Sequence, residues 1–192
     1  MKTEDRFSLK DQNIIITGGG GKLGFYHAFA ILEKKGNPIL IDLDKKKLIQ
    51  NKDKLFELFN KKVSIHKIDL TKKTQLIKFF NHQEKNKIMI NALVNNADIN
   101  SKFNDLSENL RIENLNLNFW EKHINAGLTG NFLISSLYYI YLCKFNLTGQ
   151  IINISSDLGI ISPDQDYMKI QKKPLNNKML SLYLIVLLSM GL

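Results

Sequence analysis

The stretch Thr17-Gly18-Gly19-Gly20-Gly21-Lys22-Leu23-Gly24 decides how this chain is expected to fold. It directly follows the apolar run Asn13–Ile16 and leads into a helix-like segment, Lys22–Lys35. A strand, a glycine turn and a helix N-terminus in this order are typical of the corner where a dinucleotide binds. The first turn of a helix offers N–H groups and partial positive charge to a pyrophosphate, and glycines let the backbone come close. A glycine cluster is also common in flexible turns, so the rest of the chain must decide between these interpretations.

The composition indicates one globular domain with no nucleic-acid partner and no metal site. The chain has 192 residues, of which 44% are hydrophobic and 23% charged, and its formal net charge is +9. Its basic residues are nearly all scattered lysines rather than a stripe beside aromatic side chains, which favours a solvated surface over RNA binding. Cys143 is the sole cysteine and the histidines lack ligand spacing, which argues against disulfides and a bound metal ion.

Neither end of the chain carries a targeting or membrane signal. The N-terminal residues are charged and lack the apolar core of a signal peptide. The last apolar run, Met179–Leu192, is shorter than the roughly 20 residues that a membrane-spanning helix needs. A cytoplasmic protein without a membrane partner is therefore expected.

Apolar runs alternate with amphipathic segments along the chain, which predicts strands alternating with helices. Strands are expected at Ile14–Thr17, Pro38–Asp42, Val63–Ile68, Ile88–Val94 and Gln150–Ser155. Helices are expected at Lys22–Lys35, at Lys45–Asn60, after Thr71 as N-cap, and at about Phe119–Lys144. Strands joined by crossover helices imply a parallel α/β sheet covered on both faces, which suits the unbroken apolar runs.

Asp42 stands where the second expected strand ends, 24 positions after Gly18. A carboxylate near this spacing can accept both hydroxyls of an adenosine ribose and repels a 2′-phosphate, so it favours NAD over NADP. A strand-ending Asp can also simply cap a turn, and Lys45–Lys47 nearby leave some room for NADP.

Two further strand ends carry polar residues that are candidates for the cofactor site. Asp69-Leu70-Thr71 closes the third strand, where Asp69 and Leu70 could meet the adenine. Asn95-Asn96-Ala97 follows the fourth strand, and residues at the carboxyl edge of an open α/β sheet line its ligand crevice. In so Asn-rich a chain, a plain polar loop is the alternative.

The order of these features resembles the short-chain dehydrogenase/reductase family from about Leu9 to Pro174. Thr17–Gly24 is similar to its cofactor loop, with Gly18, Gly21 and Gly24 as the spaced glycines and Lys22 in place of the common middle glycine. Val94–Ala97 is similar to its Asn-Asn-Ala-Gly motif, with Asp98 replacing the glycine. Ser156 matches the serine that orients the substrate. The resemblance implies a three-layer, Rossmann-like α/β/α fold and cofactor contacts from the residues Thr17, Gly18, Gly21, Lys22, Leu23, Gly24, Asp42, Asp69, Leu70, Asn95, Asn96 and Ala97.

Four stretches also resemble oxidoreductases labelled as flagellin-modification or surface-polysaccharide enzymes. They are Thr17–Gly24, Gly127–Phe132, Ser156–Leu158 and Ser162–Gln165. This resemblance implies a nucleotide-linked or related sugar as substrate.

The chain departs from the family at the catalytic pair, a Tyr followed four residues later by Lys. That spacing puts both on one helix face, where the ammonium lowers the pKa of the phenol that exchanges a proton with the substrate. No Tyr of this chain has Lys at that spacing. Tyr167, eleven positions after Ser156, is a weak candidate because Lys169 and Lys172 lie at unsuitable helical positions.

The pattern is lost after Lys173-Pro174, where the family would continue to its Tyr and to two more strands. We expect a dinucleotide-binding domain over 1–174 that is C-terminally incomplete. Residues 175–192 are expected to be an apolar, out-of-frame tail, with an amphipathic interfacial helix as the alternative. The fifth strand would then be a bare apolar edge that is prone to aggregation.

The expected function is NAD(P)-dependent oxidation or reduction of a hydroxyl or carbonyl on a small, sugar-like substrate, with little or no turnover in this form. The alternative is a non-catalytic nucleotide-binding module, or a remnant subunit that pairs with full-length relatives. Members of the family often pair through the long helix and the one after it, which leaves a homo-oligomer open if the fold is completed.

Overall fold

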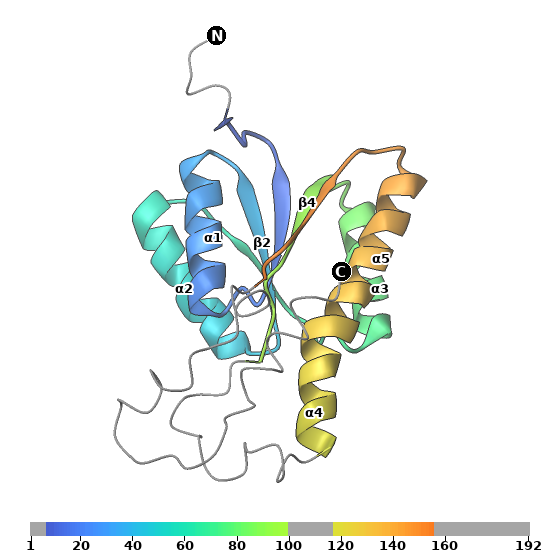
Figure 1. Cartoon of the computed structure of the whole chain (residues 1–192). Coiled ribbons are helices and arrows are strands. Elements are labelled where there is room, and N and C mark those ends of the chain that lie inside the picture. The colour runs from blue at the N-terminus through green and yellow to red at the C-terminus, as the bar shows by residue number, and fades with distance from the viewer. Residues whose placement is uncertain (1–6, 100–116, 156–192) are drawn as a thin grey trace, which may run out of the picture. The chain divides into compact units, whose positions relative to one another are not determined.

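The computed structural model describes residues 7–99 and 117–155. In it, a parallel sheet carries helices on both faces (Figure 1). The strands are β1 (Asn13–Thr17), β2 (Asn37–Asp42), β3 (Ser64–Lys67), β4 (Ile90–Asn95) and β5 (Gln150–Asn153). The helices are α1 (Lys22–Glu33), α2 (Lys45–Phe59), α3 (Lys73–Lys85), α4 (Leu117–Ile124), the π-helix η5 (Asn125–Thr129) and α5 (Gly130–Lys144). The five strands pair in parallel in the order β3-β2-β1-β4-β5, which confirms the predicted α/β class.

Contacts divide the chain into two compact units. The first comprises Met1–Ala97 and Thr129–Asn153 and holds the whole sheet. The second comprises Asp98–Leu128 and Ile154–Leu192, and its described part includes α4. The candidate site described below lies within the first unit.

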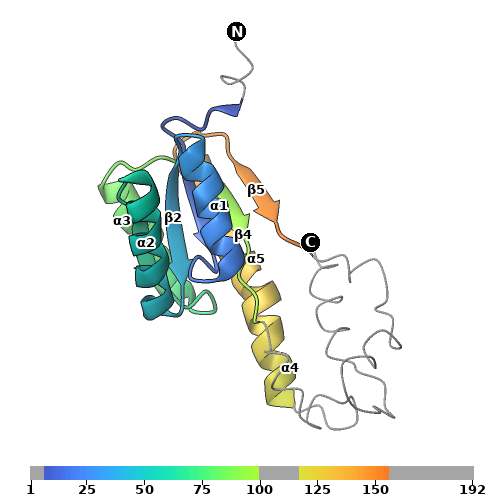
Figure 2. The same cartoon turned by 90° about the vertical axis from the view of Figure 1, so that its left-hand side faces the viewer.

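Alternate residues of the strands supply two apolar clusters, one on each face of the sheet. Ile14 and Ile16 of β1 pack with buried residues of α1 and α2, whereas Ile15 packs with α3 and α5. Figures 1 and 2 show α1 and α2 covering one face and α3 and α5 the other. Burial on both faces explains why β1 is an unbroken run of β-branched residues. The predicted three-layer arrangement is confirmed.

The start of α3 corrects one prediction. Thr71 is not the N-cap, because the helix begins at Lys73 after Lys72, whose side chain makes no capping hydrogen bond. The Thr71 hydroxyl instead donates to Asp69 Oδ1 at 2.7 Å, and the Thr71 N–H donates to the same oxygen at 2.9 Å. The carboxylate two residues earlier therefore engages the hydroxyl that would have capped the helix. By contrast, Asp44 does cap α2, accepting from the N–H groups of Lys46 and Lys47.

The predicted long helix over Phe119–Lys144 is wrong in one respect. A π-helical turn, Asn125–Thr129, separates α4 from α5. Its sequence, Asn-Ala-Gly-Leu-Thr, contains three residues of poor helix propensity, which weakens the regular hydrogen-bond ladder there.

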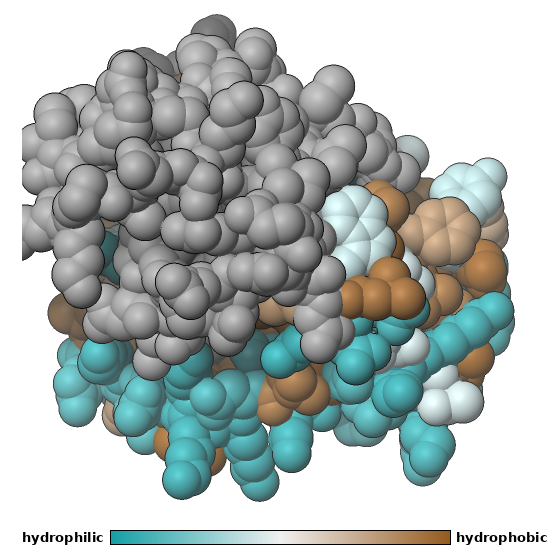
Figure 3. All heavy atoms as spheres, turned by 60° about the horizontal axis from the view of Figure 1, so that its bottom comes forward, coloured by the Kyte–Doolittle hydropathy of each residue, from teal (hydrophilic) through white to brown (hydrophobic). Residues whose placement is uncertain are grey.

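In the described part of the chain, β5 is an edge strand whose four residues are all exposed. Ile151 and Ile152 point to opposite faces of the sheet and keep 42% and 47% of their surface accessible. In Figure 2, β5 lies at the margin of the sheet. Figure 3 shows mostly hydrophilic side chains along the lower edge of the visible described surface and a mixture with more hydrophobic ones at the right.

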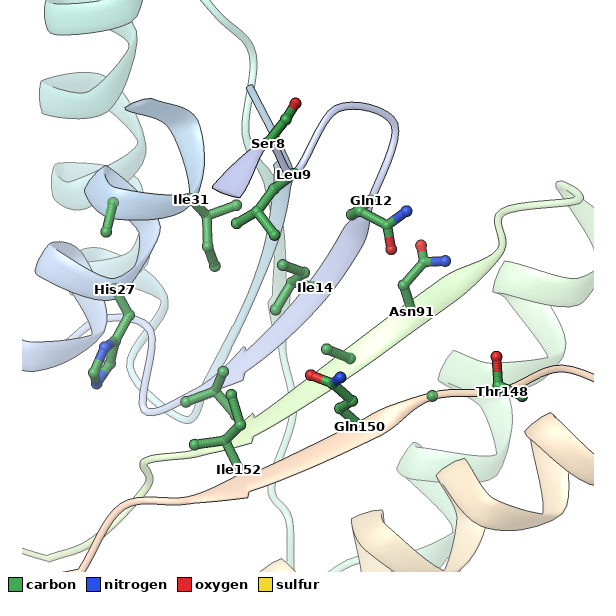
Figure 4. Close-up of a pocket in the computed structure, with 14 residues that line it drawn as sticks. Ser8, Leu9, Gln12, Ile14, His27, Ile31, Asn91, Thr148, Gln150 and Ile152 are labelled. Atoms are coloured by element: carbon green, nitrogen blue, oxygen red, sulfur yellow. The ribbon is translucent and has the colours of Figure 1, made fainter. Parts of the chain in front are cut away.

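A hollow of about 690 Å³ opens on the face of the sheet that carries α1. Ile14, Ile31 and Ile152 face it from β1, α1 and β5 (Figure 4). It begins at the amino ends of the strands, beside Gln12 and Asn91, and the described residues that line it include none of the glycine loop. Val94 and Ile152 also line the hollow, so it extends along the sheet toward the carboxyl ends of β4 and β5.

Candidate dinucleotide-binding site

The glycine loop lies at the point where the strand order reverses. On one side of β1 the chain continues through α1 to the neighbouring strand β2. On the other side the neighbour of β1 is β4, which is followed by β5. The two connections leave the sheet in opposite directions, which opens a crevice between the carboxyl ends of β1 and β4. The loop residues Gly18–Gly21 join β1 to α1 at this crevice.

Thr17 ties the glycine loop to the segment that follows β4. Its buried hydroxyl oxygen accepts the N–H groups of Asn96 and Ala97, each at 2.9 Å, and the hydroxyl lies 3.4 Å from the carbonyl of Val94. The Asn96 amide Nδ2 returns a hydrogen bond to the Thr17 carbonyl at 3.0 Å. These contacts fix both walls of the crevice relative to each other.

Gly18 and Gly24 are two of the positions where the geometry requires glycine. Gly18 has φ of +65°, and a Cβ there would lie 3.0 Å from the Cα of Ala97. A Cβ on Gly24 would overlap the carbonyl oxygen of Gly18 and lie 2.8 Å from the Cα of Gly19. The first turn of α1 is therefore packed directly on the loop, as the dinucleotide-binding corner needs.

Three of the four loop glycines use their N–H groups within the protein. Gly19 donates to the Ile41 carbonyl at 3.0 Å, Gly20 to Asp42 Oδ2 at 2.9 Å and Gly21 to the Gly18 carbonyl at 3.0 Å. The next N–H groups, those of Lys22, Leu23 and Gly24, belong to the first helical turn and have no intrahelical acceptor. The side chains of Lys22 and Leu23 are exposed. An anion at this corner would meet the helix terminus rather than the loop.

Asp42 lies beside the loop at the end of β2. Its Oδ2 accepts from Gly20 N–H and its Oδ1 accepts from Asp44 N–H, each at 2.9 Å. The side chain thus caps the turn, as the alternative interpretation held, and is at the same time oriented by two backbone groups. A carboxylate has about four acceptor positions, so each oxygen keeps capacity for one further donor.

The segment after β3 is also ordered locally. Asp69 Oδ1 accepts both hydrogen bonds from Thr71, and its own N–H donates to Gln75 Oε1 at 2.9 Å. Leu70 is buried in the cluster on the α3 side of the sheet. Asp69 is partly exposed, whereas the Leu70 side chain serves the core.

Asn95 and Asn96 are structural anchors rather than parts of a plain polar loop. The buried Asn95 Nδ2 donates to Ser135 Oγ at 2.9 Å and to Asn153 Oδ1 at 2.8 Å. These bonds join the end of β4 to α5 and to β5. Asn96 bonds to Thr17 as described above, and Ala97 closes against Gly18.

Asn51, a residue of α2 that contacts the loop, was not predicted as a site residue from the sequence. Its Nδ2 donates to the carbonyls of Gly19 at 2.9 Å and Gly21 at 3.2 Å. A signal was present: Asn51 follows Leu48 by three residues and precedes Leu55 by four, so the helical period puts it on the apolar face. A polar side chain at such a position needs a buried partner.

The candidate catalytic residues Ser156 and Tyr167 lie outside the described residues. Among the tyrosines that are described, burial raises the pKa of Tyr138 to about 12 and also raises that of Tyr141. Tyr141 donates to the Ile88 carbonyl at 2.7 Å. A phenol that exchanges a proton at neutral pH needs the opposite shift, so these two tyrosines serve packing.

The raised pKa of Tyr138 leads to a prediction about alkaline stability. The folded state holds the phenol proton up to about pH 12, whereas the unfolded chain releases it near pH 10. The stabilising contribution is therefore complete below pH 10 and is lost as the pH rises toward 12. The free energy of unfolding, measured with urea, should fall between pH 9 and pH 11.5. This fall should be about 1–2 kcal/mol smaller for Tyr138→Phe than for the unchanged protein. Tyr26→Phe, at an exposed ring, should follow the unchanged protein.

Neither a metal cluster nor a membrane-spanning helix occurs in the described ranges. Over residues 7–99 and 117–155, no three His, Cys, Asp or Glu side chains come together to hold an ion. No helix in those ranges is both long and apolar enough to cross a bilayer.

The fold places the chain among the Rossmann-type α/β proteins, and comparison with protein families narrows this class. The family described as short chain dehydrogenase matches residues 12–165. The chain therefore belongs to the short-chain dehydrogenase/reductase family, as its motifs predicted.

Two curated relatives show the same family at low identity. A short chain dehydrogenase/reductase of Gibberella zeae is 27% identical over 150 residues, which is 78% of this chain and 53% of the relative. The post-translational flagellin modification protein A of Campylobacter coli is 26% identical over 161 residues, 81% of this chain and 59% of the relative. The chain thus spans between half and three fifths of the length of these two relatives.

Solved structures confirm the fold. An NAD+-bound xylitol dehydrogenase superposes with a TM-score of 0.75 at 17% identity, over 95% of this chain and 61% of that one. A short-chain dehydrogenase/reductase from Mycobacterium marinum reaches 0.77 at 20% identity, over 97% and 67%. At these identities the likeness concerns the fold alone.

Proposed function

We propose that this chain binds a nicotinamide dinucleotide at the carboxyl edge of its sheet, with NAD preferred over NADP. The observation that carries the proposal is the corner between β1 and α1, where the loop amides are bonded internally and the first-turn amides of α1 are not. Gly18, Gly21 and Gly24 would shape this corner, and the N–H groups of Lys22 and Leu23 would hold the pyrophosphate. Thr17 would maintain it through its bonds to Asn96 and Ala97.

Asp42 is the residue that we assign to the adenosine ribose. Its carboxylate is oriented by Gly20 and Asp44, and its remaining lone pairs suit the two ribose hydroxyls. A 2′-phosphate would meet a like charge there, which supports NAD over NADP. Asp69 and Leu70 are assigned to the adenine side, with the exposed part of Asp69 as the polar contact.

The remaining assignments concern the nicotinamide half and the substrate. Asn95–Ala97 would form the crevice wall, held by Asn153, Ser135 and Thr17. Ser156 would orient a substrate oxygen. The bound dinucleotide would supply or accept the hydride, and the xylitol dehydrogenase and flagellin-modification relatives support a small, sugar-like hydroxyl or carbonyl compound as substrate. We assign the dinucleotide-binding domain to residues 1–174.

We further propose that turnover is low or absent, because no Tyr of the chain has Lys four residues later. The described Tyr138 and Tyr141 have raised pKa values and are committed to core contacts. A non-catalytic nucleotide-binding module is the second candidate function that these observations favour. A dehydrogenase assay over sugar substrates separates the two, since robust turnover would contradict the non-catalytic proposal.

The cofactor preference leads to a binding prediction. Fluorescence titration should give a Kd for NADH at least about tenfold below that for NADPH, equivalent to about 1.4 kcal/mol of like-charge repulsion at Asp42. Asp42→Asn should narrow this ratio to about threefold or less, since it removes the charge and keeps a polar side chain. Asp44→Asn is the matched control, because Asn also caps helices well. The ratio of the two Kd values should stay closer to that of the unchanged protein in this variant than in Asp42→Asn. Absence of NADH binding at millimolar concentration would refute the proposed function.

A further inference from the structure

We propose that Asn51 is a positioning residue for the pyrophosphate, acting from α2 through the carbonyls of the glycine loop; this inference rests on the proposed function. Asn51 itself would not touch the cofactor. Its Nδ2 bonds to the carbonyls of Gly19 and Gly21, and the Gly21 carbonyl shares a peptide group with the Lys22 N–H of the first turn of α1. These bonds would hold the loop in the shape that presents the Lys22 and Leu23 amides to an anion.

The burial of Asn51 shows that its amide has a specific task. The residue keeps only 9% of its surface and lies on the face of α2 that carries the fully buried Leu48 and Leu55. An apolar residue would suit a core position in a helix better, because Asn has poor helix propensity and an unpaired buried amide is costly. Both N–H bonds of this amide have acceptors in the loop.

Asn51 and Asp42 hold two peptide groups of the loop from two different elements. Asn51 binds the carbonyls of Gly19 and Gly21, and Asp42 accepts the N–H of Gly20, which belongs to the same peptide group as the Gly19 carbonyl. Space around Gly20 is also tight, since a Cβ there would lie 2.9 Å from the Cβ of Lys47 on α2. The α2 helix is thus seated on the loop by both hydrogen bonds and close packing.

A loop of four consecutive glycines needs such restraint. Glycine has the largest backbone freedom, and fixing each residue costs about 1–2 kcal/mol of conformational entropy. If the fold fixes the loop beforehand, the cofactor does not have to order it on binding. Loss of the Asn51 bonds would transfer that cost to the binding of a diphosphate and leave contacts with adenosine nearly unchanged.

The test compares ADP with adenosine, which lacks the diphosphate, on Asn51→Leu and Asn51→Ala. Leu has a similar size without polar atoms, and Ala removes the donor without adding a charge. We expect either variant to weaken ADP binding about tenfold by calorimetry, as two lost hydrogen bonds would. Adenosine binding, followed by ligand-observed NMR, should change by less than about twofold.

A control separates positioning from general destabilisation. Leu55→Val alters the same face of α2 one turn further along, away from the loop, and should lower the melting temperature with ADP affinity unchanged within about twofold. Equal losses for ADP and adenosine, or ADP losses that follow the melting temperature in all variants, would overturn the inference. Failure of both Asn51 variants to fold would make Asn51 a structural residue and overturn it as well. If the unchanged protein does not bind ADP or NADH, the proposed function itself fails.

Discussion

Gly24→Ala is expected to weaken NADH binding about 10- to 100-fold and to lower the free energy of unfolding by about 1–3 kcal/mol. The added Cβ would overlap the Gly18 carbonyl oxygen and lie 2.8 Å from the Cα of Gly19. Both obstacles are backbone atoms, so α1 must move away from the loop rather than a side chain turning aside. That movement would displace the first-turn amides from the pyrophosphate. Fluorescence titration with NADH and urea unfolding measure the two effects.

Glu33→Ala is the control for this substitution. Glu33 lies at the other end of α1 and has an exposed side chain. Its loss alters neither the loop nor the first turn of the helix, so NADH affinity should stay within about threefold. A folded Gly24→Ala protein that binds NADH as tightly as the unchanged protein would refute the assigned corner.

Thr17→Val is expected to lower the free energy of unfolding by about 2–4 kcal/mol. Val has nearly the shape of Thr but cannot accept the N–H groups of Asn96 and Ala97, each of which now bonds at 2.9 Å to the hydroxyl. Each group left without an acceptor costs about 1–3 kcal/mol where it is buried. Because the crevice walls would lose their link, NADH affinity should fall as well.

Thr17→Ser distinguishes the hydroxyl from the methyl group. Ser keeps the oxygen that accepts both N–H groups and loses one methyl, so the loss should be about 1 kcal/mol. Urea unfolding of both variants gives the comparison. Equal destabilisation by Val and Ser would show that the hydrogen bonds of Thr17 contribute nothing to the link between β1 and the segment after β4.

The sheet and its helices could be predicted because the relevant signals are local and regular. Apolar runs of β-branched residues and helical periodicity identified all five strands and the helices that cover them, with end positions shifted by one or two residues. The Gly18 turn and the carboxylate at Asp42 were found by their order along the chain.

The errors arose where two local signals competed. At Thr71 the hydroxyl could cap α3 or bond to Asp69, and the sequence does not rank the two. In the predicted helix over Phe119–Lys144, the apolar stripe continues through Asn125–Thr129 although these residues resist regular helix.

The contacts of the site depend on packing that no local pattern encodes. The bonds from Asn51 and Asp42 to the loop join residues more than 20 positions apart, and they depend on how α2 sits against α1 and β2. Asn51 was detectable as a polar residue on an apolar helix face, but its partners were not. The link between Thr17 and Asn96 similarly requires β1 and β4 to be neighbours.

The internally bonded loop amides have a kinetic consequence for a diphosphate that reaches α1. Because Gly19, Gly20 and Gly21 already donate within the protein, no rearrangement of the loop has to precede capture. The encounter rate is then governed by diffusion and by the long-range attraction of a chain of net charge +9 for an anion, which added salt weakens. Differences in affinity between related nucleotides would then come mainly from the rates at which they dissociate from the helix terminus.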